Sequence, residues 1–199
     1  MADEEDLRLL HSGAIDLQRV DLRGADLRGL DLRHRDLSDS LLEKSQCQGT
    51  NFSGANLSSA KLSFVNADNA NFSGAIVSGH AVSHATFRAA DFRNAKASRW
   101  YIANNDFSHA NFCGADLSHS TIREDNIFND SLSDENTNFD GASILRSTAR
   151  LPLFRFYDFV SGRLERIDLF GRSFSISLAT PLFFVERSSH LRRILLPLA

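Results

Sequence analysis

The sequence predicts an all-β solenoid in which five residues form one short side and twenty residues form one coil. The phrases TNFSGANLS at residues 50–58, ANFSGAIVS at 70–78 and ANFCGADLS at 110–118 recur at multiples of twenty. Every fifth position from Leu17 to Leu132 is Leu, Phe, Val, Ile, Ala or Cys, twenty-four times in a row. Neither an α-helix nor an ordinary strand has a period of five. Each unit is therefore predicted to be a short extended segment followed by a corner.

The composition of the five-residue unit predicts how its side chains point. A small residue, most often Ala, lies two positions before the central apolar residue, and Asp or Asn usually lies between them. Positions two apart face the same side of an extended segment, so the two apolar positions point inward and the Asp or Asn points outward. Gly follows in the fifth position of seven units, where a bend favours it. Four such corners return the chain to its start, which predicts a square coil.

The aromatic residues recur in phase with the twenty-residue coil. Neighbouring coils about 4.8 Å apart would bring their rings within stacking distance. We expect Leu132 to extend the aromatic column. All three prolines lie after residue 150, so every residue of the repeats can donate a backbone hydrogen bond to the next coil. The predicted core ladder consists of Phe52, Phe72, Phe92 and Phe112.

The repeated unit resembles that of a known family. ADLRG at residues 25–29, ANFSG at 70–74 and ANFCG at 110–114 match the A-(D/N)-(L/F)-x-x pattern of the pentapeptide-repeat proteins. The resemblance extends over roughly residues 15–146, and the period itself is the motif. It implies a right-handed quadrilateral β-helix of pentapeptide repeats. It also implies that residues 1–14 form a short N-terminal helical cap.

The repeats divide the chain into segments. We expect the β-helix to occupy residues 15–134 in about six coils, followed by register-shifted last repeats over residues 135–150. The shift is expected after Leu132, because DENTNFDGAS moves Phe139 and Ile144 into the central position. A divergent segment, residues 151–199, completes the chain.

The divergent C-terminal segment has two interpretations. Apolar residues recur at every fifth position and IDLFG at 167–171 resembles a repeat, which would continue the solenoid. PLFFVERSSHLRRILLP at 181–197 instead has approximate helical spacing. We favour a separate element that caps the open end and forms a homodimer there, because an uncovered solenoid end exposes unpaired edges. Its candidate contact residues are Phe154, Phe159, Phe183, Phe184 and Leu191.

The sequence argues against an enzyme and against a cofactor. The outward carboxylates are mostly followed by Arg two residues later and are expected to be solvated positions of the repeat. The histidines do not share a column, and the two cysteines are too far apart for a disulfide. No apolar stretch reaches the roughly 20 residues of a membrane span, and MADEEDLRLL is not a targeting segment. We expect a cytoplasmic protein without membrane contact.

Two functions remain as hypotheses. The first is a non-catalytic scaffold, interacting with or regulating a protein partner of unknown identity. The alternative follows from the resemblance, because some family members mimic DNA and bind gyrase, which implies protection from a quinolone or a toxin. That mechanism needs an acidic stripe, whereas the outward positions of the four sides carry net charges near −1, +1, −1 and −1. Direct nucleic-acid binding is not expected either, although residues 150–199 hold eight Arg against four acidic residues.

A candidate partner surface lies where outward or crowded positions become apolar around the third to fifth coils. Trp100 occupies a position that is otherwise small, and two interpretations remain open for it. Either a local bulge accommodates the indole inside, or the ring is exposed as an anchor for a partner. The candidate surface consists of Phe64, Ile76, Ala81, Trp100 and Tyr101.

Overall fold

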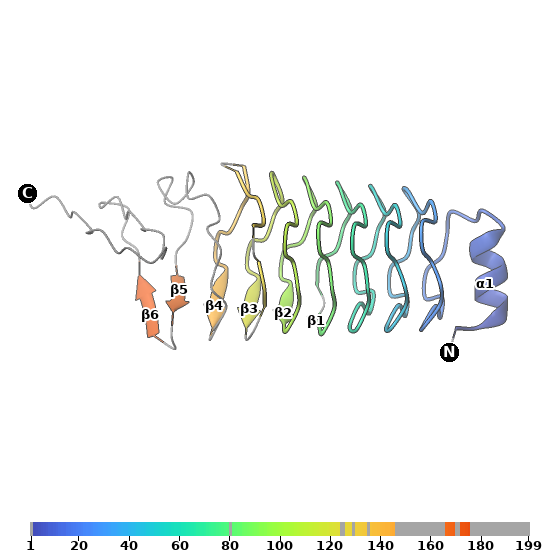
Figure 1. Cartoon of the computed structure of the whole chain (residues 1–199), viewed down its shortest axis with the longest axis horizontal. Helices are drawn as coiled ribbons and strands as arrows, with labels where there is room; N and C mark the ends of the chain where they lie inside the picture. The colour runs from blue at the N-terminus through green and yellow to red at the C-terminus, as the bar shows by residue number, and fades with distance from the viewer. Residues whose placement is uncertain are drawn as a thin grey trace, which may run out of the picture.

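The chain forms an elongated stack of coils that begins with a helix (Figure 1). A computed structural model gives the structure of the 199-residue chain. The described residues are 2–79, 81–123, 126–128, 130–134, 136–145, 166–169 and 172–175.

Helix α1, Glu4–His11, precedes the first coil. Its first turn is acidic and its last turn contains Arg8 and His11, which suits the helix dipole at both ends. Asp3 is the N-cap, and its carboxylate accepts hydrogen bonds from the backbone N–H groups of Glu5 and Asp6. Leu10 is buried and joins the solenoid core.

Helix α1 is tied to the first coils by polar contacts. The Asp3 N–H donates to the Asp21 carbonyl at 2.9 Å, and the Asp21 N–H donates to the Asp6 carboxylate at 2.6 Å. The Arg35 guanidinium donates to the carbonyls of Leu10 and Ala14 at 3.2 and 2.8 Å. These contacts give backbone groups of the first coil the partners that a preceding coil would otherwise supply.

Parallel bridges between residues twenty apart define four faces, which confirms the four-sided coil. Face 1 contains the bridge of Asp16 with Asp36, face 2 that of Asp21 with Leu41, face 3 that of Asp26 with Gln46, and face 4 that of Asp31 with Asn51. Backbone hydrogen bonds join successive coils in both directions. Leu17, for example, donates to Asp36 at 2.7 Å, and Asp36 donates to Ile15 at 2.9 Å.

Face 2 contains the longer strands. β1 (Ala81–Ser83), β2 (Tyr101–Ala103), β3 (Thr121–Arg123) and β4 (Ser143–Leu145) pair in parallel in the order β1-β2-β3-β4. The register joins Ala81 to Tyr101 and Tyr101 to Thr121. Face 2 is therefore a continuous parallel sheet over the later coils (Figure 1).

The corners place the fifth residue of the unit in the left-handed backbone region. Glycine fits this conformation at no steric penalty, and Gly54 (φ 65°) also lies directly beside the His34 ring, where a Cβ atom would collide with the imidazole. Fifteen described non-glycine residues share the left-handed conformation, most of them polar. The corner thus selects for Gly, Asn and His rather than for bulky apolar residues.

The core consists of stacked aromatic columns. The rings of the predicted ladder lie parallel, with centroids 5.1 Å apart from Phe52 to Phe72, 4.9 Å from Phe72 to Phe92 and 5.0 Å from Phe92 to Phe112. A second column runs alongside it and meets the first edge-on, with Phe87 and Phe92 5.6 Å apart. Alternating stacked and edge-on contacts suit aromatic quadrupoles.

The register shifts earlier than the sequence indicates, so two predicted core positions are wrong. The bridge of Asp106 with Ile127 spans 21 residues, which places one extra residue after Arg123. Ile127 and Leu132 consequently point outward, and 41% and 45% of their respective surfaces are exposed. Phe128 takes the inward position and stacks on Phe107 at 5.2 Å. Because Ile127 and Phe128 are both apolar, the five-residue count alone could not choose between them.

Buried Asn126 accompanies the first shift. Its amide group donates to the carbonyls of Ile102 and Arg123, and its oxygen accepts from the backbone N–H of Asn105. A second residue is inserted before Asn138, which bridges Asp116 across 22 residues. Ile144 then pairs with Ile122, in the central position that the sequence predicts.

The C-terminal segment contains two described strands of a different kind. β5 (Arg166–Leu169) and β6 (Arg172–Ser175) pair antiparallel, unlike the parallel coils. The IDL of the repeat-like IDLFG therefore lies in an antiparallel strand. The candidate contact residues of this segment lie outside the described residues, namely Phe154, Phe159, Phe183, Phe184 and Leu191.

Candidate interaction surface

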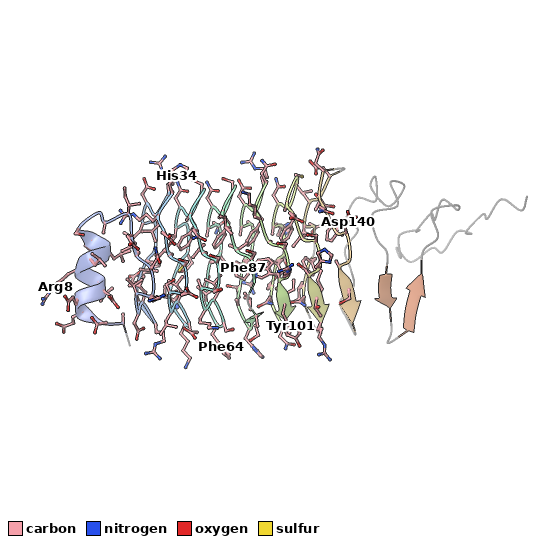
Figure 2. All side chains as sticks on the ribbon, turned by 180° about the vertical axis from the view of Figure 1, so that it is seen from behind. Arg8, His34, Phe64, Phe87, Tyr101 and Asp140 are labelled. Carbon is pink, nitrogen blue, oxygen red and sulfur yellow. The ribbon has the colours of Figure 1, made fainter. Side chains whose placement is uncertain are left out.

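Face 2 brings together most of the predicted partner surface. Phe64, Ala81 and Tyr101 all lie on its outside. Ala81 and Tyr101 stack above one another, and Phe64 lies at the corner where the same face ends. Figure 2 shows Phe64 and Tyr101 on the same long edge of the solenoid, with His34 on the opposite edge. We name six outward residues of this region the face-2 patch, namely Lys61, Phe64, Ala81, His84, Tyr101 and Arg123.

Phe64 occupies the corner position of the third coil. Its backbone has a φ of 62°, and its N–H donates to the Ser83 carbonyl at 2.9 Å. The ring is 51% exposed and lies parallel to the imidazole of His84 on the next coil, with centroids 5.0 Å apart. The corner therefore presents two stacked rings to solvent.

Tyr101 begins strand β2, two coils beyond Lys61. It is 40% exposed, and its hydroxyl accepts a hydrogen bond from Arg123 Nη1 at 3.2 Å. The Arg123 guanidinium carbon also lies 6.0 Å from the centre of the Tyr101 ring, within cation–π range. These contacts hold the Tyr101 ring and the Arg123 charge in one fixed arrangement.

Two of the five predicted surface residues lie elsewhere. Ile76 is half-buried on face 1, where it bridges Asn56 and Lys96. Trp100 is only 1% exposed, so of the two interpretations left open for it the indole lies inside the coil, and the exposed anchor is wrong. It precedes face 2 at an inward position, because side chains two before the central residue point into the coil.

The Trp100 indole belongs to the aromatic core. Its ring centre lies 5.6 Å from that of Phe92, 5.9 Å from that of Phe107 and 6.4 Å from that of Phe87. Its backbone N–H donates to the hydroxyl of Ser120 at 3.0 Å. Burying the large ring among these phenylalanines is strongly favourable, which explains why it does not reach the surface.

Sequence reasoning missed three members of the face-2 patch. Lys61, His84 and Arg123 are polar and were not singled out among the apolar positions. The twenty-residue period could have identified His84, since it lies one coil above Phe64. The period could also have placed Lys61 and Thr121 in the column of Tyr101, with Arg123 two residues further along.

Several outward carboxylates of the solenoid are paired with arginine. Four units pair an Asp with the Arg two residues later, at 2.5 to 2.7 Å, and Arg88 reaches Asp106 on the next coil at 2.6 Å. Hydrogen bonds from Arg23 and Arg28 lower the pKa values of Asp21 and Asp26 to about 2. The outward column of face 1 is interrupted as well, because it reads Asp16, Asp36, Asn56, Ile76, Lys96 and Asp116.

Metal binding and a reactive thiol find little support in the described part of the chain. It contains no group of three or more His, Cys, Asp or Glu that could hold a metal ion. Burial raises the pKa of the Cys47 thiol to about 12, which keeps it protonated and unreactive. Nor does any helix among the described residues have the length and apolar character to cross a membrane.

Comparison with known families identifies the class of protein. The family model described as pentapeptide repeats matches in eight copies over residues 15–40, 36–74, 68–99 and 83–118. Together these matches span more than half of the 199-residue chain. The chain therefore belongs to the pentapeptide-repeat family. No curated protein sequence matches it significantly.

Several solved structures are similar to this chain. One is alr5209, a pentapeptide repeat protein from Nostoc PCC 7120, with 26% identity, coverage of 51% of this chain and 80% of that chain, and a TM-score of 0.36. QnrB1, a plasmid-mediated fluoroquinolone resistance protein, has 23% identity, coverage of 69% and 80%, and a TM-score of 0.46. HetL from Nostoc sp. strain PCC 7120, involved in heterocyst differentiation regulation, has 22% identity, coverage of 72% and 80%, and a TM-score of 0.34.

Proposed function

We propose that this protein is a non-catalytic scaffold that binds a protein partner through the face-2 patch. The observation that carries the proposal is Phe64, which combines a left-handed backbone with a half-exposed aromatic ring. Among the described non-glycine residues in this conformation, it is the one with a large apolar side chain. A bulky residue in this region is an outlier that calls for an explanation.

The backbone of Phe64 is unfavourable for folding. A left-handed conformation costs an L-residue roughly 1–2 kcal/mol, which Gly avoids. An exposed ring gains little of the burial energy that would offset this cost, apart from its stack on His84. A residue that destabilises its own corner and points to solvent is better explained by contact with a partner. Aromatic residues are also frequent energetic centres of protein interfaces.

DNA mimicry with topoisomerase protection is the alternative function, and the electrostatics of the faces do not favour it. A DNA mimic needs a continuous negative field along one side. Here five Asp–Arg pairs neutralise carboxylates on faces 2, 3 and 4, and Lys96 interrupts the column of face 1. Purified protein is accordingly expected not to protect gyrase supercoiling from a quinolone at micromolar concentration.

The architecture suggests roles for the two ends. The contacts of α1 with Asp21 and Arg35 support a cap at the N-terminal end. We also propose that residues 151–199 cap the other end and form a homodimer there. The right-handed sense of the coil is likewise an inference from membership of the family.

The test is affinity capture from the native cells with the wild-type protein and with Phe64→Gly. Glycine suits the corner, so this variant should fold at least as stably while losing the partner. Ser59→Gly is the matched control, because Ser59 is also an exposed left-handed corner residue (φ 59°) but lies on face 1. Undiminished capture by Phe64→Gly would contradict the proposal.

A further inference from the structure

We propose that the face-2 patch binds an acidic, extended segment of its partner, in which two carboxylates flank an apolar side chain. This inference rests on the proposed function and specifies the chemistry of the partner. It follows from the backbone, the charge and the spacing of face 2.

The backbone of face 2 leaves side chains as the means of binding. Strands β1, β2, β3 and β4 form one parallel sheet, so their N–H and C=O groups pair between coils rather than across the outer surface. A partner segment lying over the middle of this sheet cannot join it as an extra strand. Its affinity must come from the rings of Phe64, His84 and Tyr101 and from the charges beside them.

The charge of the face-2 patch is positive. Lys61 and Arg123 stand at its two ends, and neither forms an ion pair with a described residue. The described outward residues of this face from Lys61 to Arg123 include no Asp or Glu, and Glu124 and Asp125, which follow in the sequence, lie outside the described residues. The first coil of this face and faces 3 and 4 instead carry Asp–Arg pairs within one unit. The patch therefore complements negative rather than positive groups.

The spacing of the two charges suggests the spacing of the carboxylates. Lys61 and Arg123 belong to coils three apart, which corresponds to about 14 Å along the axis at ~4.8 Å per coil. An extended peptide rises about 3.3 Å per residue, so this distance corresponds to about four residues. Residues at i, i+2 and i+4 face the same side of an extended chain. The middle residue would then contact the exposed surface around Ala81, between Phe64 and Tyr101.

The structure favours a peptide over a single-stranded nucleic acid. Aromatic rings beside cations also suit nucleic acids, but those ligands carry a phosphate at every nucleotide and need a basic groove that follows the backbone. The patch has only Lys61 and Arg123 at its ends, and the 199-residue chain has a net charge of −3. A short acidic segment needs only two cations, which is the number that the patch provides.

The experiment is a selection of random nonapeptides displayed on phage against the purified full-length protein. We expect enrichment of Asp or Glu at i and i+4 with an apolar residue at i+2. A synthetic peptide from that pool should bind about tenfold more weakly to the Lys61→Glu, Arg123→Glu double variant, because two attractive contacts become repulsive. Lys96→Glu, on face 1, is the matched control and should leave binding unchanged.

Three results would overturn the inference. One is the absence of enriched peptides, and another is tighter binding of a twenty-nucleotide oligothymidylate than of the selected peptides. The third is a selected pool without enrichment of Asp or Glu, or a pool whose peptides bind the double variant as tightly as the wild-type protein. If the peptides selected in this third case bind Phe64→Gly more weakly than they bind the wild-type protein, the interaction surface stands and only its proposed preference for acidic residues fails.

Discussion

Face 2 and face 4 of the solenoid are built from the same five-residue unit but differ on the outside. Between residues 31 and 114, the corners of face 4 are Gly, Asn or His, and two of its carboxylates are paired with Arg33 and Arg93. Over the third to fifth coils, face 2 instead exposes Phe64 and Tyr101. Inward positions are mostly apolar on both faces, with Ser40, Thr50 and Ser120 as buried polar exceptions. The comparison indicates that stacking constrains the inside of every coil, while the outside is free to differ from face to face.

The largest effect should come from the interior of face 4. Phe92→Ala removes a ring that stacks on both Phe72 and Phe112, and the neighbouring coils cannot close around the void. We expect the free energy of unfolding to fall by about 3–5 kcal/mol, measured by denaturant melts. Tyr101→Ala, an aromatic change on the outside of face 2, should cost less than about 1 kcal/mol. Equal losses would contradict the assignment of inner and outer positions.

The next effect concerns the register shift. Asn126→Ala should lower the free energy of unfolding by about 1–3 kcal/mol. The carbonyls of Ile102 and Arg123 and the N–H of Asn105 would each lose a buried hydrogen-bond partner. Asn111→Ala removes only a half-buried amide oxygen that accepts from Cys113, and serves as the control. Matching denaturant midpoints for the two variants would show that Asn126 does not hold the shifted coil.

The register shift also shows how far sequence reasoning reaches. The four-sided coil and the Phe52 to Phe112 ladder follow from periodicity, because one extra residue would move every later side chain to a wrong position. The site of the insertion could not be predicted, since Ile127 and Phe128 suit the inward position almost equally by hydrophobicity. The burial of Trp100 could not be predicted from the period either, because it depends on the space among Phe87, Phe92 and Phe107.

A smaller effect, of opposite sign, should come from the outside of face 2. Phe64→Gly relieves the left-handed backbone but loses the stack on His84. We expect the free energy of unfolding to stay the same or to rise by up to about 1 kcal/mol. Thermal melts of this variant beside Ser59→Gly measure the difference. A clear loss of stability would assign Phe64 a structural role and weaken the contrast between the two faces.

The smallest effect is the change of stability at acidic pH. Hydrogen bonds from Arg23 and Arg28 lower the pKa values of Asp21 and Asp26 to about 2 in the folded protein. Their contribution to stability is therefore complete above the unfolded value of about 3.9 and is lost as the pH falls from there to about 2. Because these pairs are exposed, the amplitude should be small.

An arginine variant isolates this contribution. Arg28→Gln should melt at a slightly lower temperature than wild type near neutral pH, and the difference should vanish by about pH 2. Thermal melts across this range measure it. A difference that persists at low pH would mean that Arg28 stabilises the coil through packing rather than through Asp26.

The central claim is that a protein partner contacts the outside of face 2. Its most direct test is site-specific photocrosslinking in the native cells, with benzoylphenylalanine placed at Tyr101 or, on the corner of face 4, at Asn94. Both sites are exposed, so reactivity alone does not separate them. We expect a discrete adduct with a second protein from position 101 and none from position 94. No adduct from position 101, or the same adduct from both positions, would contradict the claim.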